Sequence, residues 1–111
     1  MEELLLDYLR FIEGEADSDQ KFDPDRKINE QFDVLDEMDF RIATVKFEMH
    51  AMVDIPRTPK NYELTLRELV EKISELSKVS KANVPTFLKK KKAELSRIAH
   101  EMAASMANIF G

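Results

Sequence analysis

The sequence predicts a small all-α protein. Apolar residues recur at helical spacing in four segments, two of these segments begin with N-capping residues, and the one segment that alternates like a strand loses its phase. The chain has 111 residues, of which 43% are hydrophobic and 35% are charged. Such a length and composition indicate one globular domain with a small core and a highly charged surface.

The first helix is expected over residues 2–13, followed by a long loop. The helix carries one apolar face and ends at Gly14. The acidic stretch 14–35 is predicted to be an ordered loop, held to the core by its apolar residues Phe22, Ile28, Phe32, Val34 and Leu35. Its acidic run Asp17, Asp19, Asp23 and Asp25 lacks the glycine and the final glutamate of a calcium loop, so no metal site is expected.

A second helix is predicted over residues 36–53. The strand interpretation fails because Phe40 and Ile42 lie in one phase, whereas Val45, Phe47 and Met49 lie in the other. The helical interpretation keeps one register, and its apolar stripe is Met38, Ile42, Val45, Met49 and Met52. Asp36 is the expected N-cap or first-turn acid, and Asp39 lies in the first turn.

The opposite face of this second helix is also apolar, through Phe40, Ala43, Phe47 and Ala51. Two interpretations remain open. The long loop or the C-terminal helix covers these aromatic rings, or they form a surface for a partner. The candidate partner-binding residues are Phe40, Arg41, Phe47 and Ile55, and Phe47→Ser is expected to cost less stability than Ile42→Ser.

Two further helices complete the prediction. Thr65 and Glu68 form a T-x-x-E capping box at the start of a helix over residues 65–76. Residues 78–84 are expected to form a linker before a long amphipathic helix over residues 85–111, with Pro85 in its first turn. The Lys89–Lys92 run is expected to be solvated or paired with nearby acids.

Charge and composition limit the functions open to the chain. The net charge is −5, and residues 1–40 hold 14 acidic and 4 basic side chains, a net of −10. Such an acidic half disfavours nucleic acid and suits basic protein partners. No cysteine, signal peptide, membrane-spanning run, glycine-rich phosphate loop or paired histidine site is evident, so we expect a cytoplasmic protein that is not an enzyme.

Three short motifs in register resemble the acyl carrier protein family over residues 1–77. The Asp36-Glu37-Met38-Asp39 stretch resembles the Asp-Ser-Leu-Asp motif that opens that family's second helix. Ile55-Pro56 and the Thr65–Val70 segment fall at the spacing of its later motifs. The resemblance implies an acyl-carrier-like helical bundle with a long first loop, to which residues 85–111 add a C-terminal helix.

One departure from the family decides the expected function. The family attaches phosphopantetheine to the serine of this motif, and here that position is Glu37. A carboxylate cannot form the phosphodiester, so no cofactor is expected. Glu37 either imitates the negative charge of the phosphate at a helix N-terminus or is an ordinary first-turn acid.

The resemblance then implies a non-catalytic protein that binds enzymes of acyl-chain metabolism, in fatty acid, lipid or polyketide synthesis. Two alternatives stay open. The chain is a genuine carrier whose serine is mutated at position 37, or it is an unrelated helical adaptor that uses its C-terminal helix. Residues 88–109 of that helix also present an apolar stripe suited to a homodimer.

Overall fold

The computed structural model describes residues 2–16 and 18–110, without the side chains of residues 108–110. It contains the α-helices α1 (Glu2–Glu15), α2 (Glu37–Ala51), α3 (Leu66–Ser74) and α4 (Val84–Phe110). Three short 3-10 helices, η1 (Ile28–Glu30), η2 (Pro59–Glu63) and η3 (Lys81–Asn83), interrupt the connecting loops. No strand occurs in the part of the chain that is described, so the predicted all-α bundle is confirmed.

The core lies among α1, α2 and α3, with α1 packed against both of the other helices. Tyr8 of α1 is completely buried, and its ring stacks on Phe47 with 4.3 Å between the ring centroids. Phe40 stacks on the same ring at 6.2 Å. The Tyr8 hydroxyl and Thr44 Oγ1 are 2.6 Å apart, so the polar tip of this buried ring has a partner.

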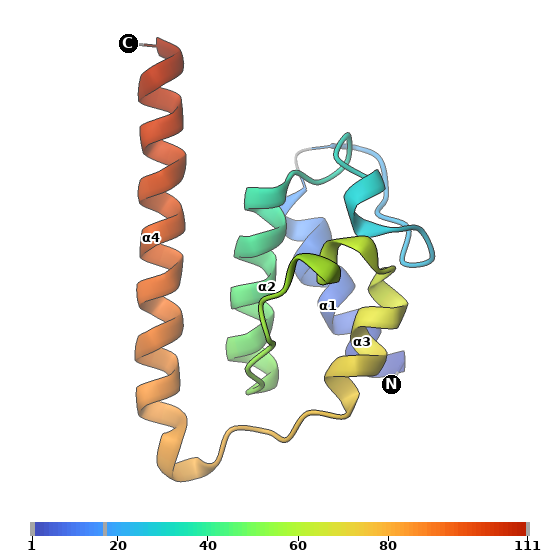
Figure 1. The fold of residues 1–111 in the computed structure, drawn as a ribbon, viewed down its shortest axis with the longest axis vertical. Helices are drawn as coiled ribbons and strands as arrows, with labels where there is room; N and C mark the ends of the chain where they lie inside the picture. The colour runs from blue at the N-terminus through green and yellow to red at the C-terminus, as the bar shows by residue number, and fades with distance from the viewer. Residues whose placement is uncertain (1, 17, 111) are drawn as a thin grey trace.

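Both apolar faces of α2 are therefore covered within the chain (Figure 1). The Phe40 and Phe47 face packs on α1, and not under the C-terminal helix, as one interpretation of the sequence had it. The opposite face packs on α4, where Val45 and Ile98 are fully buried. Ile42 and Met49 are only partly buried there.

The predicted N-terminal caps are confirmed, but the predicted end of the first helix at Gly14 is wrong. Asp36 accepts a hydrogen bond from the Asp39 amide, and Thr65 and Glu68 form the full capping box. Gly14 does not end the first helix, because α1 continues to Glu15. At the end of α2, the C-cap residue Met52 adopts the left-handed conformation, with φ of 55°. Glycine is the usual residue in this conformation.

The long loop between α1 and α2 is ordered around a buried glutamine. The Gln31 amide receives a hydrogen bond from the Asp23 amide and donates one to the Asp23 carbonyl, each at 2.8 Å. Four of the five apolar residues expected to hold this loop are buried, but Phe32 is 60% exposed. Asp17 lies outside the described residues.

The helix α4 lies alongside α2 and runs past its N-terminal end (Figure 1). Its 27 residues span about 40 Å, against about 22 Å for the 15 residues of α2. The overhanging residues 103–107 are all exposed, and Ile109 of the predicted dimer stripe lies outside the described side chains. Among the described helices, none is long and apolar enough to cross a membrane.

The burial pattern reverses the expected order of two substitutions on α2. Phe47→Ser removes a fully buried ring and should lower the free energy of unfolding by about 3–5 kcal/mol. Ile42→Ser removes a partly buried side chain from the α4 contact and should cost about half as much. Urea titration of both variants measures the difference. An equal or larger loss for Ile42→Ser would contradict this packing.

Candidate binding pocket and buried charge network

A pocket of about 340 Å³ opens beside the N-terminal half of α2. Its wall and floor include the rings of Tyr8, Phe40 and Tyr62, and the rings of Phe40 and Tyr62 meet edge to face at 5.3 Å. Three charged residues, Glu37, Arg41 and Arg57, also line it. An apolar cavity with a few convergent polar groups has the usual form of a small-ligand site.

Of the candidate residues of the Asp36–Asp39 motif, the pocket lining includes Glu37. Glu37 is the first residue of α2 and is exposed, and Asp36 caps the helix from the position before it. Met38 and Asp39 are partly buried. The structure thus brings Glu37 and Arg41 to one cavity, as expected for residues one turn apart on a helix.

Three of the four candidate partner-binding residues are not available at the surface. Phe40 and Ile55 are buried and form part of the pocket lining, whereas Phe47 is completely enclosed in the core and does not line it. Assigning Phe40, Phe47 and Ile55 to an exposed partner surface was wrong, because α1 and η2 cover that face. Arg41 alone of the four is substantially exposed, at 33% of its side chain.

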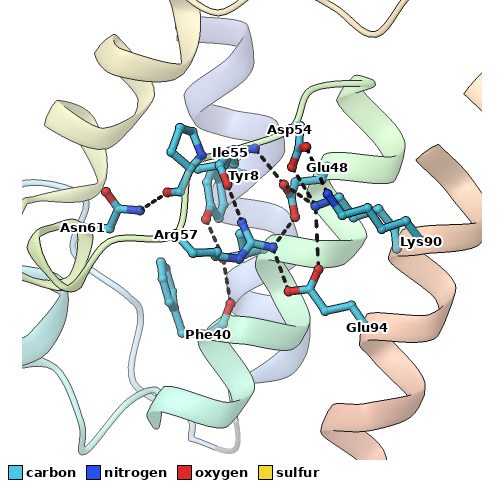
Figure 2. Close-up of polar contacts among 12 residues, drawn as sticks. Tyr8, Phe40, Glu48, Asp54, Ile55, Arg57, Asn61, Lys90 and Glu94 are labelled. Carbon is cyan, nitrogen blue, oxygen red and sulfur yellow. Dashed lines mark hydrogen bonds and ion pairs between the residues drawn. The ribbon is translucent and has the colours of Figure 1, made fainter. Parts of the chain in front are cut away.

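A buried carboxylate, Glu48, has no exposed surface and contacts Arg57 of the pocket lining (Figure 2). Glu48 accepts hydrogen bonds from the Ile55 amide at 2.7 Å and from the Lys91 ammonium at 2.9 Å. Its other oxygen accepts from Arg57. Donors thus reach it from the loop after α2 and from α4, which satisfies a charge that burial would otherwise make costly.

Lys91 completes the network from the side of α4. Only 3% of its side chain is exposed, and it also donates to Asp54 at 2.9 Å. Burial by itself would lower the pKa of Lys91, but the hydrogen bonds to Asp54 and Glu48 outweigh it, so this pKa lies above its ordinary value. The ammonium is therefore charged throughout the physiological range.

Arg57 joins the network to the pocket. Figure 2 shows it between Glu48 and Glu94, and it also donates to the Ile55 carbonyl at 3.0 Å. Burial by itself would lower the pKa of Arg57, and the two glutamates outweigh that effect and raise it. Since Arg57 lines the cavity as well, the pocket wall depends on the position of α4.

Sequence reasoning missed Glu48 as a structural residue. The signal that could have identified it is its position on a helix that is apolar on both faces. Such a helix has little exposed surface, so an acid on it needs a buried partner. The signal for Lys91 was its register, because it falls between Leu88 and Leu95 at the spacing of the apolar stripe. The expectation that the lysine run pairs with nearby acids is confirmed for Lys90 and Lys91.

No cluster of three or more histidine or acidic residues suited to a metal ion occurs in the described residues. Comparison of the chain with protein-family models, with curated proteins and with solved structures finds no match. The candidate site therefore rests on the geometry of this molecule.

Removing the charge of Glu48 should destabilise the protein strongly. In Glu48→Gln an amide NH₂ group would face the donors of Arg57 or Lys91, and we expect a loss of about 3 kcal/mol in unfolding free energy. Lys91→Met should cost less, because Glu48 keeps Arg57 and the Ile55 amide. Urea titration measures both, with exposed Glu71→Gln as the control. A Glu48→Gln loss no larger than that of the control would contradict the network.

The pKa of Asp54 indicates the pH below which its ion pairs with α4 stop stabilising the fold. Burial by itself would raise the pKa of Asp54, but the hydrogen bond and charge of Lys91, with the charge of Lys90, outweigh it and lower the pKa. A carboxyl whose pKa is lower in the folded state stabilises that state above its ordinary value of 3.8, and this contribution is lost as the pH falls further.

We therefore expect Asp54→Asn to reduce the stability at pH 6 and to flatten the fall of Tm below about pH 4. Thermal unfolding followed by circular dichroism across that range measures this. The exposed Asp33→Asn is the matched control. Parallel pH profiles for wild type and Asp54→Asn would count against the pairing.

Proposed function

We propose that this chain is a non-enzymatic, acyl-carrier-like binding protein that recognises enzymes of acyl-chain metabolism without carrying phosphopantetheine itself. The supporting observation is the placement of Glu37. It is exposed at the first position of α2, next to its capping Asp36 and at the mouth of a pocket. This is the place where the sequence resemblance puts the attachment serine.

The order of elements also supports the proposal. A long ordered loop separates α1 from α2, and the 3-10 helix η2 leads into α3, which begins with the expected capping box. The Arg67 guanidinium bridges that loop to α1 by pairing with Asp25 and Glu2. The main core cluster draws on α1, α2, α3 and the loops between them and contains no described residue of α4, which supports an acyl-carrier-like unit in this part of the chain.

The partner surface in this proposal differs from the one expected from the sequence. With Phe40, Phe47 and Ile55 buried, the exposed groups next to the start of α2 are Phe32, Asp33, Asp36 and Glu37. An exposed aromatic ring beside three acids suits a partner with basic residues around an apolar contact.

A second candidate function is a helical adaptor that uses the end of α4. The observation that favours it is the overhang of α4, where Met106 is 56% exposed and residues 103–107 have no cover from α2. An uncovered helical end with an apolar side chain can pack on another helix.

The deciding experiment asks whether the site still accepts the prosthetic group. We would incubate wild type, Glu37→Ser and the control Asp33→Ser with coenzyme A and a broad-specificity phosphopantetheinyl transferase, and measure intact mass. We expect modification of Glu37→Ser alone, because only this variant places a hydroxyl at the exposed start of α2. If none of the variants is modified, the acyl-carrier-like proposal loses its support, and the adaptor is favoured.

A further inference from the structure

Both arginines that line the pocket are paired with acids of α4. Arg41 Nη1 lies 2.8 Å from Glu101, and Arg57 Nη2 lies 3.2 Å from Glu94. These two glutamates are the only acidic residues of α4, which carries five basic ones. They are seven residues apart, which places them on one face of the helix, two turns from each other.

The two glutamates reverse the charge of the pocket. Its charged lining residues are Glu37, Arg41 and Arg57, a net of +1. With Glu94 and Glu101 included the sum is −1. The buried pair of Glu48 and Lys91 adds nothing to this sum, because its charges cancel.

The pocket lining itself indicates the chemistry of a ligand. The rings of Phe40 and Tyr62 offer an apolar surface, and the two guanidinium groups offer planar donors that match a carboxylate. Glu37 at the mouth opposes a doubly charged group, so a net of +1 favours a single negative charge. A volume of about 340 Å³ admits a small molecule.

We propose that this pocket binds a small ligand with an apolar body and one carboxylate, and that α4 is its internal competitor. Glu94 and Glu101 occupy the guanidinium groups of Arg57 and Arg41 that the carboxylate of the ligand would otherwise bind. The binding site does not depend on the acyl-carrier resemblance, because it follows from the lining residues and their ion pairs.

The test compares the wild type with two double variants of equal net charge. The variant Glu94→Gln/Glu101→Gln removes both competing carboxylates, and the control Glu13→Gln/Glu71→Gln removes two exposed carboxylates elsewhere. The probe is 4-phenylbutyrate, and the neutral alcohol 4-phenylbutanol has the same apolar body. Chemical-shift titration of the full chain gives each dissociation constant and verifies that every variant is folded.

We expect 4-phenylbutyrate to bind Glu94→Gln/Glu101→Gln about tenfold more tightly than wild type or the control. The alcohol should bind all three proteins alike. Arg41→Gln should weaken binding of the carboxylate and leave binding of the alcohol unchanged, because Arg41 faces the pocket and lies outside the buried network.

Equal affinities of the three proteins for 4-phenylbutyrate would overturn the internal competition. Failure of 4-phenylbutyrate to bind Glu94→Gln/Glu101→Gln, or identical binding of the acid and the alcohol to it, would overturn the carboxylate site. None of these results bears on modification of Glu37→Ser, so the two proposals fail independently.

Discussion

The buried carboxylate of Glu48 is the constraint around which the surrounding structure is arranged. A charge without solvent contact requires several donors, and they come from three places: Arg57, the amide of Ile55, and Lys91 of α4. Meeting this requirement holds the loop after α2 against the helix and brings α4 alongside. The packing of α4 is thus coupled to the geometry of a loop that also shapes the pocket.

The helix α2 has a dual role because of this arrangement. One face carries Phe40 and Phe47 into the main core, where Tyr8 packs on both. The other face carries Val45 to α4, where Val45 and Ile98 are fully buried, and ion pairs at Arg41, Glu48 and Asp54 accompany this apolar contact. The first contact buries aromatic rings, and the second combines burial of aliphatic side chains with several ion pairs.

The helix α4 lies outside the main core cluster and contacts residues that line the pocket. The main core cluster contains no described residue of α4, so this helix packs outside the centre of the core. Its glutamates meet the arginines of the pocket, and its lysines meet the acids of α2 and of the loop after it. The ion pairs of α4 with Arg41 and Arg57 thus join this helix to the lining of the pocket.

Much of the local structure could be predicted from the sequence, because caps and periodicity act over a few residues. Asp36, Thr65 with Glu68, and the helical register of residues 36–53 each depend on neighbours within one turn or two. The same is true of the exposed position of Glu37 at the start of α2, which follows from its place beside the cap. Gly14 shows the limit of such signals, since α1 continues past it to Glu15.

The partners of these helices were decided only by the tertiary structure. A helix with two apolar faces does not specify which face meets α1 and which meets α4, so Phe47 and Ile42 were assigned in the wrong order. The ion pairs from Arg41 to Glu101 and from Glu48 to Lys91 join residues 60 and 43 positions apart. The sequence by itself determined the helices and the N-terminal caps of α2 and α3, because these depend on short-range hydrogen bonds and spacing. The pocket and its charge came from the fold, because only packing brings distant side chains within a few ångströms of each other.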